Sequence, residues 1–109
     1  MSRPPAERPP AERWPHLARL CAAYVHQDWD VDGPTPDLAI RRFAREAPVE
    51  VVEGAGDDIT ALLRAVPTEA GLDRVLDALA CAYRPTAAGT TVRAWLTHVR
   101  SILYRRSGV

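Results

Sequence analysis

The sequence predicts an all-α fold, a compact bundle of about five amphipathic helices. Apolar residues recur at intervals of three and four along most of the chain, which is the spacing of one helix face. Proline and glycine interrupt this pattern repeatedly, so we expect short connections between the helices. With 109 residues, 47% of them apolar and 26% charged, the chain has the size and composition of one domain with its own core.

The first 13 residues differ from the rest. Arg-Pro-Pro-Ala-Glu occurs at 3–7 and again at 8–12. Because proline is excluded from helix interiors, we expect 1–13 to be an extended, disordered tail, with a docking peptide for an aromatic groove as the alternative. The helical domain then covers 14–106. The chain start lacks the apolar segment of a secretion signal, which predicts a cytoplasmic protein.

The first helix is expected to begin at Pro15, because a proline at the first position loses no hydrogen bond. It should fade near His26 to Asp28. Four residues at helical spacing form its inner face: Leu17, Leu20, Cys21 and Tyr24.

A second helix is predicted to start at Thr35-Pro36-Asp37, with a capping hydroxyl and an acid near the positive end of the helix dipole, and to end at Pro48. Its inner face is expected to contain Leu38 or Ala39, Phe43 and Ala47.

The segment 49–66 is ambiguous, because Val49-Glu50-Val51-Val52 also suits a strand and Gly54 and Gly56 weaken a helix. Helical phase persists across the glycines, so we predict one helix, bent or frayed near Gly54. Its inner face would be Val52, Gly56, Ile59, Leu63 and Val66.

Two further helices are predicted after this segment. Thr68 should cap the fourth, and Thr90 or Thr91 should start the fifth after a loop at 84–89. The fourth buries Leu72, Val75, Leu76 and Leu79, with Tyr83 extending that face. The fifth buries Trp95, Leu96, Val99, Ile102 and Leu103.

No catalytic or cofactor motif is found. Cys21, His26, Cys81 and His98 lack the spacing of a zinc site, and the two cysteines are expected in the core. A calcium loop beginning at Asp28 would need an acid at its last position, where Ala39 stands. We therefore expect a protein without metal or cofactor that is not an enzyme.

Charge is unevenly distributed along the chain, although fourteen Arg balance fourteen Asp and Glu. Residues 20–60 carry nine acids against three Arg, net −6, whereas 61–109 carry seven Arg against three acids, net +4. An acidic surface of this kind can steer a basic partner. The candidate partner-binding residues are Asp28, Asp30, Asp32, Asp37, Glu50, Glu53, Asp57 and Asp58, although each one alone also suits a helix cap or solvated turn.

The string Tyr24-Val25-His26-Gln27-Asp28-Trp29-Asp30 resembles the small helical immunity proteins of contact-dependent growth inhibition systems. The resemblance continues through Gly33, Thr35-Pro36 and Phe43, and then through Tyr83-Arg84-Pro85 to Trp95-Leu96, covering about 17–103. It implies a non-catalytic cytosolic inhibitor that binds the C-terminal domain of a delivered toxin, commonly a nuclease. An acidic inhibitor surface can cover the basic site with which a nuclease grips phosphates.

Within the string, Tyr24, His26, Gln27, Asp28 and Trp29 are expected to be mainly structural. Trp29 would seal the core or, alternatively, anchor a contact, while its neighbours order the helix end. Three rival functions remain open. They are a stand-alone interaction or regulatory module, a small hydrolase using His26 and Asp28, and a nucleic-acid binder using Arg93, Arg100, Arg105 and Arg106.

Overall fold

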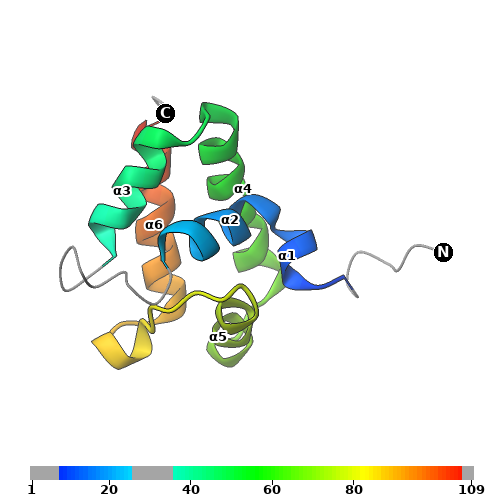
Figure 1. Ribbon diagram of the computed structural model, residues 1–109. Coiled ribbons are helices and arrows are strands. Elements are labelled where there is room, and N and C mark those ends of the chain that lie inside the picture. Colours follow the sequence, from blue (N-terminus) through cyan, green and yellow to red (C-terminus); the bar gives the residue numbers. More distant parts are fainter. Residues whose placement is uncertain (1–7, 26–35, 107–109) are drawn as a thin grey trace.

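The computed structural model describes residues 8–25 and 36–106, and within these ranges all regular structure is helical (Figure 1). The predicted all-α class is confirmed, and the five expected helices correspond to α2 through α6. The elements are α1 (Pro10–Arg13), α2 (Pro15–Tyr24), α3 (Asp37–Glu46), α4 (Val49–Ala65), α5 (Glu69–Ala78), a 3₁₀ turn η3 (Thr86–Ala88) and α6 (Val92–Arg106).

The short helix α1 corrects the expectation that the chain is extended up to residue 13. Pro9 keeps a polyproline backbone with φ −57° and ψ 150°, and Pro10 occupies the first helical position. Proline is excluded from helix interiors but suits this position, so the second Pro-Pro pair starts a helix. The guanidinium of Arg13 lies 4.3 Å from the centre of the Trp14 ring, and Trp14 is buried in the core.

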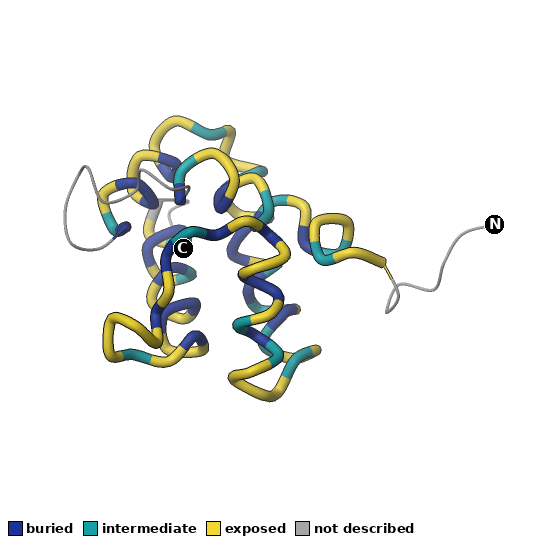
Figure 2. Tube along the Cα trace, turned by 60° about the horizontal axis from the view of Figure 1, so that its bottom comes forward, coloured by how far each residue is buried: buried dark blue, intermediate teal, exposed yellow. Residues whose placement is uncertain are grey.

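The helices pack around two long central ones. α4 lies along α6, α2 packs on α4, α3 packs on α6, and α5 covers one end of α6 (Figure 1). Each of the helices α2 to α6 buries one side and exposes the other (Figure 2). The largest fully buried side chains come from α2, α3, α4, α5 and α6, and they include Leu17, Phe43, Ile59, Leu72 and Leu96.

α4 runs as one helix across both of its glycines, which confirms a helix over 49–66. The glycines allow aromatic rings from neighbouring helices to approach the α4 backbone closely. A Cβ at Gly54 would lie 2.3 Å from the His16 ring of α2, and a Cβ at Gly56 would lie 2.5 Å from the Tyr104 ring of α6. Residues that weaken an isolated helix therefore bring α2, α4 and α6 together.

The end of α5 shows why Tyr83 is buried without extending that helix. Ala80 adopts a left-handed backbone with φ 61°, and the N–H groups of Ala80 and Cys81 donate to the carbonyls of Asp77 and Leu76. This is a Schellman cap in which alanine takes the usual place of glycine. The chain then continues without regular secondary structure, and Tyr83 packs on Trp95 with ring centres 5.1 Å apart.

Side chains cap the last two helices, and one of these interactions comes from another helix. Thr68 caps α5 as predicted, accepting from Gly71 N at 3.1 Å, and Thr91 accepts from Ala94 N at 3.0 Å. In addition, Glu69 of α5 accepts from the first two N–H groups of α6 at 2.7 and 3.0 Å. None of the helices in the described ranges is long and apolar enough to cross a membrane.

The inner face of α3 is broader than its spacing suggested. Ala39, Ile40, Phe43 and Ala44 are buried, whereas Leu38 is 52% exposed. Pro36 precedes the first turn as the N-cap instead of occupying it, and Thr35 lies outside the described residues.

Candidate functional site

Three of the predicted acidic residues form a row along the outer face of α4. Glu50, Glu53 and Asp57 are spaced three and four residues apart, so they follow one another on the same side of the helix, and all three are exposed. Asp57 accepts a hydrogen bond from the Tyr104 hydroxyl at 3.0 Å. We call Glu50, Glu53 and Asp57 the acidic row. It is available to a basic partner.

Asp58 belongs to a different environment from its neighbour Asp57. One of its carboxylate oxygens accepts the backbone N–H groups of His16 and Leu17 at 2.8 and 3.0 Å. These are orphan donors in the first turn of α2, whose own N-cap residue, Trp14, provides no side-chain acceptor. Asp58 therefore joins α4 to α2 as a cap supplied from another helix.

Burial raises the pKa of the Asp58 carboxyl above its ordinary value of 3.8. The two backbone N–H groups act in the opposite direction, as does the nearby His16, but burial has the larger effect. Asp58 thus serves the fold chiefly as a hydrogen-bond acceptor.

Asp37 lies at the start of α3, apart from the acidic row. Its carboxylate is 2.9 Å from Nε2 of His98 on α6. Asp57, in contrast, is hydrogen-bonded to Tyr104 of α6, and His98 and Tyr104 point to different sides of that helix because an α-helix turns about 100° per residue. The acids in the described ranges are therefore not one cluster. Asp28, Asp30 and Asp32 lie outside the described residues.

Of the family string, the structure describes Tyr24 and Val25. The Tyr24 ring meets Phe43 edge-on, with centres 5.4 Å apart at 76°, and its hydroxyl reaches Glu46 at 3.5 Å. The Val25 carbonyl accepts from Ala82 N at 2.8 Å, which ties the end of α2 to the segment that follows α5. Both residues hold the fold together at this corner. His26, Gln27, Asp28 and Trp29 lie outside the described residues.

The two cysteines are buried next to each other, although only Cys21 lies in a helix. Burial and a hydrogen bond shared with Cys81 raise the pKa of Cys21, the hydrogen bond having the larger effect, while the same bond lowers the pKa of Cys81. No group of three or more His, Cys, Asp or Glu that could hold a metal ion occurs in the described ranges.

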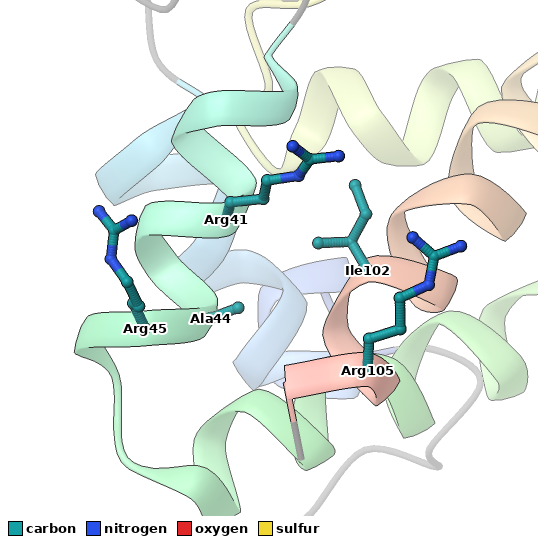
Figure 3. Close-up of a pocket in the computed structure, with 5 residues that line it drawn as sticks. All are labelled: Arg41, Ala44, Arg45, Ile102 and Arg105. Atoms are coloured by element: carbon teal, nitrogen blue, oxygen red, sulfur yellow. The ribbon is translucent and has the colours of Figure 1, made fainter. Parts of the chain in front are cut away.

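A basic groove lies between α3 and α6, and sequence reasoning did not identify it as a site (Figure 3). The groove is open to solvent, has a volume of about 260 Å³, and is lined by Arg41, Ala44 and Arg45 of α3 and by Ile102 and Arg105 of α6. In Figure 3, Arg41 and Arg105 extend from the two helices on either side of Ile102, while Arg45 points away along the outside of α3.

The sequence did indicate, for each helix separately, that the arginines on the two sides of this groove lie outside the core. The α3 arginines fall off the predicted inner stripe, and Arg105 falls in the last turn of α6. Their meeting depends on how α3 packs on α6, which no local pattern specifies.

Comparison with known proteins decides the family. A family model described as CdiI immunity protein matches residues 13–103. This chain belongs to the CdiI immunity protein family. The resemblance seen at Tyr24 to Asp30 is thereby confirmed, and the matched range contains both the acidic row and most of the basic groove.

The CdiI fold is also found in a solved structure. A chain in the crystal structure of the CdiA-CT/CdiI complex from Y. kristensenii 33638 superposes with a TM-score of 0.77. The sequences are 23% identical, and the match covers 86% of this chain and 96% of that chain. At this identity the likeness establishes a shared fold. No match was found among curated proteins.

Proposed function

We propose that this CdiI family member neutralises a cognate CdiA-type toxin C-terminal domain by binding it and covering its active site. The family match over 13–103 carries this proposal, and the shared fold with a chain of a CdiA-CT/CdiI complex supports it. The chain would act in the cytoplasm as a stoichiometric inhibitor without catalysis of its own.

The acidic row suggests the chemistry of the toxin surface. Glu50, Glu53 and Asp57 present carboxylates on one exposed helix face. A nuclease binds phosphates with Lys and Arg, so carboxylates at this spacing can occupy the same cationic positions. We therefore propose a nuclease as the toxin and the acidic row as part of the contact. Asp28, Asp30, Asp32 and Asp37 remain predicted contributors, whereas Asp58 has a structural partner.

Coexpression with the cognate toxin domain tests the function itself. Cells that express the toxin should grow only when this chain is present, and the two proteins should co-purify at equal stoichiometry. Growth arrest despite abundant folded chain would contradict the proposal.

Charge reversal tests the role of the acidic row. Glu50→Arg combined with Glu53→Arg should slow association at least about tenfold and reduce its dependence on salt, because the row steers a basic partner. The matched control is Asp73→Arg with Asp77→Arg on α5. It changes the net charge equally and breaks only surface ion pairs with Arg84, at 3.8 and 2.6 Å. Equal effects of the two double variants would eliminate the acidic row as a specific contact.

A further inference from the structure

We infer that the basic groove between α3 and α6 is a second contact for the toxin, which receives an acidic segment carrying an apolar side chain. This inference rests on the proposed function for the identity of the partner. Its chemistry rests on the charges and the floor of the groove and on an exposed apolar side chain next to Arg41.

The charges of the groove are of one sign. Arg41 and Arg105 come from different helices and lie on either side of Ile102 (Figure 3). Both side chains are exposed. Two guanidinium groups held on facing helices suit two carboxylates of one bound segment, because each can make paired hydrogen bonds to a carboxylate.

The floor of the groove is apolar, and helical spacing places an exposed apolar side chain next to Arg41. Ala44 and Ile102 form the floor, at 3% and 5% exposure. Leu38 lies three residues before Arg41 on the same face of α3 and is 52% exposed, one of two large apolar side chains exposed in the described ranges. An apolar side chain between two carboxylates would therefore contact Leu38 and the floor.

These features favour a protein segment over a nucleic acid. A duplex is bound through many phosphate contacts along its backbone, and sequence reading needs side chains that enter a groove of the duplex. Here arginines of α3 and α6 line an open hollow of about 260 Å³ with an apolar floor, which suits a protein side chain better than a phosphate backbone.

The acidic row and the basic groove lie on different sides of the pair formed by α4 and α6. Tyr104 of α6 faces Gly56 of α4, whereas Ile102 and Arg105 face α3. A toxin that contacts both would need a basic site and a nearby acidic segment. Such paired complementarity fixes the orientation of a complex and rejects partners with only one of the two charges.

The experiment compares groove variants with matched controls in binding to the purified cognate toxin domain. Arg41→Glu with Arg105→Glu should weaken the Kd at least about tenfold relative to Arg19→Glu with Arg74→Glu, which changes the net charge equally on α2 and α5. Leu38→Ala should weaken binding about threefold or more, whereas Leu38→Met, which keeps an apolar side chain of similar size at this 52% exposed position, should have no effect. Thermal unfolding confirms that every variant is folded.

The outcomes separate the groove from the proposed function. If the wild-type chain and both controls fail to bind the toxin, the proposed function fails and the groove inference fails with it. If they bind and the groove variants bind equally tightly, only the groove inference is overturned. The inference is also overturned if the wild-type chain self-associates and Arg41→Glu with Arg105→Glu abolishes this self-association but leaves toxin affinity intact. That result would assign the groove to a second copy of the chain. The inference is likewise overturned if the wild-type chain binds RNA or DNA and the same double variant loses that binding while its toxin affinity stays intact.

Discussion

Replacing Asp58 distinguishes a structural acid from the acids proposed to bind the toxin. Asp58→Ala removes the acceptor for the N–H groups of His16 and Leu17. Loss of a helix cap costs about 0.5–2 kcal/mol, and here two donors are left in a half-buried position, so we expect a loss of about 1–2 kcal/mol. In a domain of this size that lowers Tm by roughly 5–10 °C.

Asp58→Asn is the informative companion variant, because the amide keeps an acceptor oxygen and removes the charge. Since burial raises the pKa of Asp58, the carboxylate form gains nothing from the fold relative to the neutral form. We therefore expect Asp58→Asn to unfold at or above the wild-type Tm at pH 7. Urea or thermal unfolding of the three proteins decides this, and equal loss of stability in both variants would refute the capping argument.

The stability difference between Asp58→Asn and the wild type should change with pH in one direction. A group with a raised folded pKa contributes its full stability below the unfolded value, near 3.8, and loses it as pH rises through the raised value. Asp58→Asn cannot lose that contribution. Its free energy of unfolding relative to wild type should therefore increase between about pH 4 and pH 7, and a decrease over this range would contradict the assignment.

Three other variants test the packing and the helix ends. Gly56→Ala should destabilise the fold by about 1–2 kcal/mol, because the added Cβ meets the Tyr104 ring. In a Tyr104→Ala background, the same change should stabilise the fold by about 1 kcal/mol. If urea unfolding shows that Gly56→Ala destabilises both backgrounds, the close packing is contradicted. Ala80→Gly should raise the free energy of unfolding by about 0.5–1 kcal/mol by relieving the left-handed backbone, and a loss of stability would argue against the cap at the end of α5. Glu69→Ala should cost about 1–2 kcal/mol through the start of α6, with Glu69→Gln intermediate, and an unchanged Tm for Glu69→Ala would count against that cap.

Periodicity predicted the helices well because most of their stability comes from one buried face. Every residue predicted for the inner faces of α5 and α6 is buried, although Tyr83 lies beyond the end of α5 and Val92 of α6 is buried as well. Thr68 caps α5 as its sequence position indicated. Such features depend on local spacing, which a sequence displays directly.

The features that were missed depend on contacts between distant segments. Gly54 and Gly56 look like helix breakers until the rings of His16 and Tyr104 are placed against them. The end of α5 carries alanine at the left-handed position, so no glycine marked it. Proline at the first helical position likewise concealed α1, because the same residue also favours extended chain.

The candidate site was only partly predictable for the same reason. The sequence shows that acids are concentrated in residues 20–60, yet only the fold separates Glu50, Glu53 and Asp57, which share an exposed face, from Asp58, which caps another helix. The arginines of the basic groove are remote in sequence and meet only where α3 packs on α6.

Titration of the cognate toxin's enzymatic activity with the purified chain tests the central claim most directly. Full inhibition at one chain per toxin molecule, reached without any change in the toxin's covalent structure, is the predicted result. A toxin that remains active while saturated with this chain, or one that is inactivated at far less than equal stoichiometry, would contradict neutralisation by occupation of the active site.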